Sequence, residues 1–202
     1  MKNILITGFD PFHGETINPS FEIIKFLDTS AFHANIHIAE IPTVFYDASK
    51  KVIDLIHTIK PDIVIMLGQA GGRKEISLER VAINIDDANI PDNLGRMPSN
   101  QPISVFGPTA YFASLPLAQL ESVLKSKHIP VAISNTAGTF VCNHLMYSVL
   151  HEAHVNNLNM IAGFIHVPYL PEQTLTKPSK FSLDQSIMVQ ALEIIIETLI
   201  DL

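Results

Sequence analysis

The feature that most constrains the fold is a short, uninterrupted apolar segment in the first third of the chain. Residues 62–67 read Asp-Ile-Val-Ile-Met-Leu. A strand that is apolar at consecutive positions is typical of a parallel sheet covered on both faces. The stretch before it, Thr43 to Lys60, has apolar residues at helical spacing and stops before Pro61, which predicts a helix capped by Thr43. Together these segments predict a buried sheet with helices packed against it.

The rest of the chain repeats this alternation of strand and helix. Further helices are predicted from Asn18 and Pro19, over Leu117–Lys127, after Cys142, and from a capping box of Ser182 and Gln185. Further strands are predicted at residues 4–6, 36–41, 76–85, 131–133 and 161–167, whereas residues 86–104 are typical of a loop. This order predicts an α/β fold: a single domain over residues 1–202, with three layers (α/β/α) around a mainly parallel, mixed central sheet.

Composition and charge narrow the classes of partner. Hydrophobic residues reach 47%, yet no apolar run approaches the ~20 residues that span a bilayer, so we expect no membrane partner. We assign the apolar surplus to a deep core and a subunit interface, with the almost wholly apolar last helix buried there. The net charge is −7 without a cluster of Lys and Arg, so we expect no nucleic-acid partner. The single cysteine and the lack of a signal peptide before Asp10 favour a cytoplasmic location.

The single cysteine, Cys142, lies between a predicted strand and a predicted helix, just past Gly138. A thiol at a helix N-terminus faces unpaired N–H groups and the positive end of the helix dipole, and both favour the thiolate. This contribution is about 0.3–1 kcal/mol, less than one pKa unit at about 1.36 kcal/mol. A reactive Cys142 therefore needs a basic partner. The alternative is a buried free cysteine that acts as a small hydrophobic residue.

Among nine histidines, His166 is the best candidate for that partner. It lies at the end of an apolar strand, and reacting groups in open α/β sheets gather at the carboxyl ends of strands. Because Cys142 lies just past the end of the preceding strand, we expect two neighbouring parallel strands to bring the two side chains together. A histidine capped by loop backbone is the alternative. His151 and His154 are one residue short of a zinc-protease spacing, so we expect no metal site.

A third group is needed to hold the imidazole in one tautomer. Glu79 continues the apolar face of the strand predicted over residues 76–85, and a carboxylate in such a place needs a specific partner. Two interpretations stay open: orientation of His166, or a salt bridge with an arginine. The candidate arginines are Arg73 and Arg80. Three other acids compete weakly with Glu79 for His166: Asp10, Asp86 and Asp87.

Two other segments are less specific. The loop Gly68–Gly72 follows a strand, which is typical of an anion-binding loop. The alternative to a cysteine enzyme is therefore an α/β protein that handles nucleotides or nucleosides. The loop matches neither the dinucleotide fingerprint nor the phosphate loop. Phe9 and Phe12 flank the loop after the first strand, where two rings suit a small flat ligand. From spacing alone, packing beneath the loop explains the two rings better.

These residues together resemble the pyroglutamyl peptidase type I family, cysteine peptidases that remove an N-terminal pyroglutamyl residue. Ordered segments over nearly the whole chain carry the resemblance: residues 7–12, 18–20, 68–84, 90–93, 134–144 and 164–173.

The resemblance implies that Cys142 is the nucleophile, His166 the general base and then acid, and Glu79 the orienting carboxylate. It also implies a substrate pocket with Phe9, Phe12, Asn18 and Gln69, pyroglutamylated peptides as substrates, no metal or cofactor, a cytoplasmic location and a homotetramer.

The chain departs from the family's pattern at two positions. Relatives usually carry arginine where this chain has Asn89, which predicts a weaker catalyst if that cation helps to hold developing negative charge. Relatives tend to have glycine in place of His13, which predicts a reshaped pocket mouth.

Overall fold

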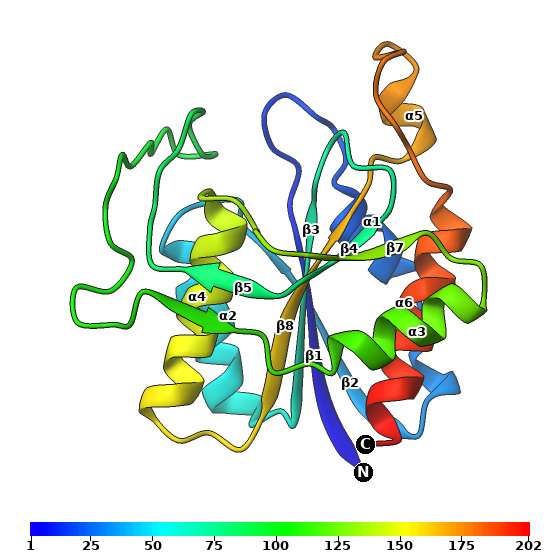
Figure 1. Cartoon of the computed structure of the whole chain (residues 1–202), viewed down its shortest axis with the longest axis horizontal. Coiled ribbons are helices and arrows are strands. Elements are labelled where there is room, and N and C mark those ends of the chain that lie inside the picture. Colours follow the sequence, from blue (N-terminus) through cyan, green and yellow to red (C-terminus); the bar gives the residue numbers. More distant parts are fainter.

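A computed structural model describes residues 1–202, and Figure 1 shows a twisted sheet with helices on both faces. Four strands in the order β2-β1-β3-β8 run parallel, while β4 pairs antiparallel with β8 and parallel with the edge strand β7. The mainly parallel, mixed sheet is therefore confirmed. The bounds of these strands are β1 (Lys2–Phe9), β2 (Ala34–Ile41), β3 (Ile63–Gln69), β4 (Ile76–Glu79), β7 (Val131–Ser134) and β8 (Ile161–Val167).

The helices form two layers that cover the sheet (Figure 1). One face carries α1 (Pro19–Lys25), α3 (Leu117–Ser126) and α6 (Gln185–Ile200), and the other carries α2 (Asp47–Ile59) and α4 (Val141–Val155). Strand β3 divides the two cores, as its consecutive apolar residues predict: alternate side chains, such as those of Ile65 and Met66, enter opposite clusters.

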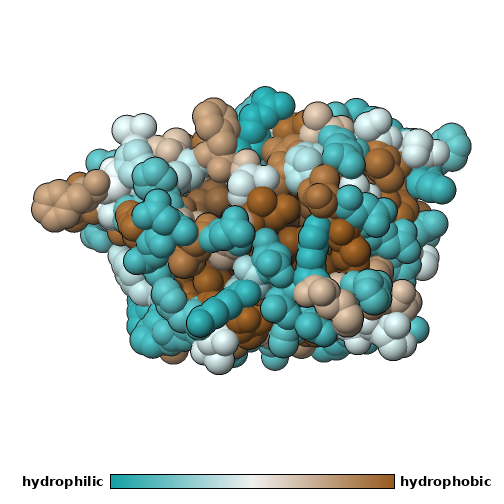
Figure 2. Space-filling view, turned by 90° about the horizontal axis from the view of Figure 1, so that it is seen from below, coloured by the Kyte–Doolittle hydropathy of each residue, from teal (hydrophilic) through white to brown (hydrophobic).

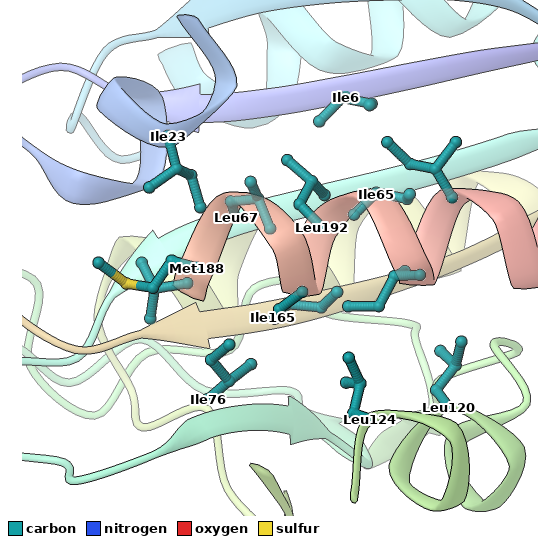
Figure 3. Close-up of a cluster of buried hydrophobic side chains, with 14 of the residues drawn as sticks. Ile6, Ile23, Ile65, Leu67, Ile76, Leu120, Leu124, Ile165, Met188 and Leu192 are labelled. Carbon is teal, nitrogen blue, oxygen red and sulfur yellow. The ribbon is translucent and has the colours of Figure 1, made fainter. Parts of the chain in front are cut away.

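The apolar character of α6 is explained by the core that it covers. In Figure 3, Met188 and Leu192 of α6 pack over Ile65 of β3 and Ile165 of β8, and all four are at most 2% exposed. A helix buried along most of its circumference needs apolar residues on most of its faces. Burial within this chain accounts for six of them, while Ile187, Val189, Ile194 and Ile200 stay partly exposed.

Three local predictions are wrong. The strand predicted over residues 76–85 breaks at Arg80 into β4 and β5 (Val81–Ile83), and β5 pairs with β6 (Ala110–Phe112) in a separate two-stranded sheet. Helix α2 begins four residues later than predicted, because the N–H and the hydroxyl of Thr43 bond to Asp10 instead of capping a helix. Helix α6 has no capping box, and its N-cap residue is Asp184. The sequence also did not predict two short helices, η1 (Thr29–Ala31) and α5 (Pro171–Thr174).

The carboxyl ends of the central strands gather the loops that matter for the site. In Figure 1 the loop after β1, the loop after β3 and the segment with α5 after β8 lie at the same, upper end of the sheet. No helix of the chain has both the length and the apolar character needed to cross a membrane. No group of three or more His, Cys, Asp or Glu side chains has the geometry of a metal site.

Candidate active site

A cavity of about 260 Å³ opens at the carboxyl ends of β1, β3 and β8. Cys142 and His166 both line it, together with three phenylalanine rings, those of Phe9, Phe12 and Phe140. The side chains that the sequence selected from three distant segments therefore share one chamber. Its walls are mostly apolar, and a few polar groups converge on it, which is the usual character of a small-molecule site.

Cys142 is the second residue of α4 and is half-buried. The first backbone hydrogen bond of this helix runs from the N–H of His144 to the carbonyl of Phe140. The N–H groups of residues 141–143 precede it and are not used within the helix. Gly138 makes the preceding turn with a φ of 79°, a conformation that favours glycine. Cys142 thus lies beside backbone donors suited to a developing oxyanion.

The predicted route by which Cys142 meets His166 is wrong. Strands β7 and β8 are not neighbours, because β4 lies between them and runs antiparallel to β8. Residues 135–140 lead from β7 across the molecule to α4 (Figure 1), and this loop carries Cys142 to the cavity. The inserted strand β4 has a further effect: it brings Glu79 alongside His166.

Glu79 is wholly buried and has two partners on one oxygen. Its Oε1 accepts from Nδ1 of His166 at 2.7 Å and from Nη1 of Arg73 at 2.5 Å. Both interpretations left open by the sequence therefore hold at once. Because Nδ1 donates to a carboxylate, Nε2 of His166 is left as the basic nitrogen.

The competing acids are engaged elsewhere. Asp86 accepts from Nδ1 of His144 at 2.8 Å, Asp10 from the N–H of Thr43 at 2.6 Å, and Asp87 from the N–H of Asn100 at 3.1 Å.

The three groups have shifted pKa values with identifiable causes. Burial raises the pKa of the Cys142 thiol to about 12, with the negative charge of Glu79 acting in the same direction. Burial lowers the pKa of His166 and outweighs the attraction of Glu79. Burial alone would raise the pKa of Glu79, but the hydrogen bond from His166, helped by Ser134 and Arg73, holds it below its usual value. The resting site therefore contains a thiol, a neutral imidazole and a carboxylate.

These pKa shifts run against the thiolate predicted from the helix terminus. The dipole of α4 supplies less than one pKa unit. Removal of the sulfur from water, together with Glu79, acts in the opposite direction and is the larger effect. Cys142 therefore gives up its proton to a base during the reaction, and His166 is positioned at the same cavity to take it.

Two glycines of the predicted anion-binding segment, Gly68 within β3 and Gly71 in the loop after it, have a packing role. A Cβ at Gly68 would lie 2.7 Å from Cζ of Phe164 and 3.0 Å from Sγ of Cys142. A Cβ at Gly71 would overlap the ring of Tyr169. Gly68 and Gly71 make room for the sulfur and two aromatic rings, which explains these two glycines without a bound nucleotide.

The four predicted substrate-binding residues all line the cavity, but they contribute differently. Phe9 is buried, whereas Phe12 is half-buried and lies 6.2 Å, between ring centroids, from Phe140. The polar atoms of Asn18 are committed: its Oδ1 caps α1 by accepting from Ser20, and its Nδ2 donates to the carbonyl of Asp10. Gln69 is bonded through its oxygen only, which leaves its two N–H donors unused.

The two departures from the family's pattern lie outside this lining. Asn89 is exposed on the long connection between β5 and β6. His13 is exposed in the loop after β1 and has a φ of 53°, where glycine is free of strain.

Sequence reasoning missed two residues of the site, Phe140 and Gln173. Phe140 completes the aromatic wall. Arg73, one of the two arginines predicted as partners of Glu79, also donates through Nη2 to the carbonyl of Thr136 at 3.1 Å. The apolar residue directly before the helix of Cys142 was a usable signal for Phe140. No local pattern marks Gln173, which lies 104 residues from the Gln69 that it contacts.

Fold and site together define a class: α/β proteins with a half-buried cysteine, a histidine and a buried carboxylate at one cavity, as in cysteine hydrolases. Comparison with known proteins narrows the class. The sequence profile of the pyroglutamyl peptidase family matches residues 2–202. The chain belongs to this family.

Individual relatives and solved structures agree with this placement. A pyrrolidone-carboxylate peptidase of Thermoanaerobacter sp. (strain X514) is 53% identical over 196 residues, which are 97% of each chain. The crystal structure of pyroglutamyl peptidase I from Bacillus amyloliquefaciens superposes with a TM-score of 0.93 at 47% identity, over 96% of this chain and 95% of that one. Pyrrolidone carboxyl peptidase from Pyrococcus furiosus gives a TM-score of 0.94 at 39% identity, over 98% of each chain.

Proposed function

We propose that this protein is a cysteine peptidase that removes N-terminal pyroglutamyl residues from peptides, with Cys142 as nucleophile, His166 as general base and acid, and Glu79 as the residue that orients His166. One observation carries the assignment of roles: Cys142 and His166 open onto the same cavity, and Glu79 is bonded to Nδ1 of His166 behind it. Membership of the pyroglutamyl peptidase family supports the reaction.

The mechanism follows from the resting protonation states. His166 takes the thiol proton on Nε2 as the sulfur of Cys142 attacks the pyroglutamyl carbonyl, and Glu79 stabilises the imidazolium that forms. The N–H groups at the start of α4 bond to the oxyanion. The intermediate collapses to a thioester, and His166 returns the proton to the departing amine. His166 then activates a water molecule that hydrolyses the thioester and frees Cys142.

Specificity is supported by the size and lining of the cavity. A cavity of about 260 Å³ has room for a five-membered lactam. The rings of Phe9 and Phe12 enclose its apolar faces, Gln69 offers donors to its carbonyl, and Asn18 shapes the wall while it holds the loop. A site that pairs the polar groups of a ring rejects analogues that lack them.

The experiment that tests the proposal is release of a fluorophore from a pyroglutamyl amide. Wild type is expected to turn over the amide, and Cys142→Ala to fall to the level of buffer. Equal rates for the two proteins would refute the proposed function.

We also propose that residues 1–202 act as one peptidase domain, in the cytoplasm, as a homotetramer, without a nucleic-acid or membrane partner. The oligomer is supported by apolar side chains exposed on the connection between β5 and β6, where Val105 is 77% and Phe106 99% exposed. Other apolar areas lie among hydrophilic side chains on the face in Figure 2. Light scattering coupled to gel filtration tests the oligomer, and a monomer at micromolar concentration would contradict it.

A further inference from the structure

A buried glutamine of α5, Gln173, contacts the substrate cavity only through another residue. It is 6% exposed and does not line the cavity, but its Nε2 donates to Oε1 of Gln69 at 2.9 Å. We propose that Gln173 is a positioning residue that fixes the orientation of the Gln69 amide, so that the cavity offers N–H donors to the ring carbonyl of the substrate. This inference rests on the proposed function for the identity of that ring.

The orientation of the Gln173 amide is dictated by groups other than Gln69. The backbone N–H of Leu170 can only donate, and it bonds to Oε1 of Gln173 at 3.0 Å. On the other side, Nε2 of Gln173 faces the carboxylate of Glu15 at 3.3 Å and the carbonyl of Ile17 at 3.5 Å. Both of these oxygens can only accept. A flipped Gln173 would set oxygen against oxygen and leave the Leu170 N–H without an acceptor.

The orientation of Gln69 follows from that of Gln173. Because Gln173 presents a donor, Gln69 turns its Oε1 towards it and its Nε2 away. This Nε2 makes no hydrogen bond within the chain, while Gln69 itself lines the cavity. The ring of a pyroglutamyl residue carries one carbonyl acceptor. Two N–H groups held towards the cavity fit that acceptor, and an amide free to rotate would offer oxygen half of the time.

Gln173 also joins three segments of the site. It bonds to Glu15 and Ile17 in the loop after β1, which carries Phe12, and to Gln69 at the end of β3. Glu15 is in turn paired with Lys177 after α5. The donor face of Gln69 is therefore held in a fixed place relative to the ring of Phe12.

The sharpest test is Gln173→Glu, which keeps the shape of the side chain. A carboxylate at this position still accepts from the Leu170 N–H, but it offers no donor, so Gln69 is expected to turn its Nε2 to it and its oxygen to the cavity. Dissociation constants of 2-pyrrolidone, which presents a carbonyl acceptor, and 2-iminopyrrolidine, which presents a donor instead, are measured by calorimetry. We expect wild type to prefer the lactam, and the ratio of the two constants to shift by about tenfold or more towards the amidine in the variant.

Two controls separate this effect from added charge, because 2-iminopyrrolidine is a cation at neutral pH and a carboxylate at position 173 attracts it whichever way Gln69 is turned. Of the two, Gln173→Met decides between these causes, and an unchanged ratio in that variant would overturn the inference. Gln190→Glu makes the same change on an exposed position of α6 and is expected to keep the wild-type ratio. Gln173→Met adds no charge and has no donor, so Gln69 is free to turn and the ratio is expected to shift in the same direction by a smaller factor.

Kinetics with a pyroglutamyl amide complete the test. Gln173→Glu is expected to raise KM about tenfold with little change in kcat, since binding of the ring is weakened equally in the ground state and the transition state. An unchanged ligand ratio in Gln173→Glu would overturn the inference, as would a loss of kcat and melting temperature with the ratio intact. Absence of turnover by wild type would instead refute the proposed function, and the ligand ratio would still test Gln173.

Discussion

Gly68→Ala is the substitution whose consequence the structure defines most closely. The added Cβ would lie 3.0 Å from Sγ of Cys142, about 0.4 Å inside the 3.4 Å at which ordinary contacts begin, and 2.7 Å from Cζ of Phe164. Phe164 is fully buried, so its ring has little room to withdraw. Overpacking of this kind costs about 1–3 kcal/mol. Because a misplacement of about 1 Å costs about 10²-fold in rate, displacement of the sulfur by several tenths of an ångström is expected to lower kcat about tenfold or more.

The assay is hydrolysis of a fluorogenic pyroglutamyl amide at saturating substrate, with urea denaturation of the same preparations. Gly163→Ala is the matched control, because the nearest atom to its Cβ would be Cδ1 of Leu115, at 2.6 Å, on the face of the sheet that α3 and α6 cover. We expect Gly163→Ala to lose stability with an unchanged kcat, and Gly68→Ala to lose both. A wild-type kcat in Gly68→Ala would refute the reasoning that this glycine makes room for the sulfur.

Four further predictions concern the histidine, its carboxylate and the pocket wall. Glu79→Gln removes a charge-assisted hydrogen bond worth about 1.5–3 kcal/mol to the imidazolium, so kcat should fall about 10- to 150-fold in steady-state assays, and an unchanged kcat would contradict the role of Glu79. The pKa of His166 is lowered by burial, so the neutral base persists below the ordinary histidine value of about 6.5, and the acid limb of kcat/KM should lie below that pH. By the same linkage the unfolded chain binds this proton more readily, so His166 should make the protein less stable as the pH falls from about 6.5 through its folded pKa. Asn18→Ala removes the cap of α1 and should lower the free energy of unfolding by about 0.5–2 kcal/mol in urea titrations, and equal stability would show that this cap contributes little.

The sequence predicted the layers of the fold because burial leaves a strong local pattern. The consecutive apolar residues of β3 reflect its coverage by helices on both faces, and the apolar residues around α6 reflect its burial on most sides. Both elements were predicted close to their observed bounds. Asn18 and Pro19 predicted the start of α1 correctly, because a helix cap is a hydrogen bond between residues that are close in sequence.

Strand order was not predictable in the same way. Nothing near β4 reveals that it inserts between β7 and β8, since pairing is decided by contacts between segments far apart in sequence. Cys142 and His166 line the same cavity, although the predicted route that joins them was wrong.

The protonation state of Cys142 was also beyond sequence reasoning. The position of the helix terminus was visible in the chain, but the burial that outweighs its dipole arises only in the folded protein, where the sulfur lies against Gly68 from a segment over 70 residues away. The orientation of Gln69 has the same origin, because Gln173 sets it from 104 residues away.

The most direct test of the central claim is a search for the thioester on Cys142. Wild type is mixed with a pyroglutamyl ester, quenched in acid within the first turnover and digested, and the peptide that contains Cys142 is weighed by mass spectrometry. A pyroglutamyl adduct on that peptide in wild type, absent in Cys142→Ala and accumulating more slowly in Glu79→Gln, is the predicted result. Turnover of the ester by wild type with the adduct on another residue, or by Cys142→Ala at the wild-type rate, would contradict the account.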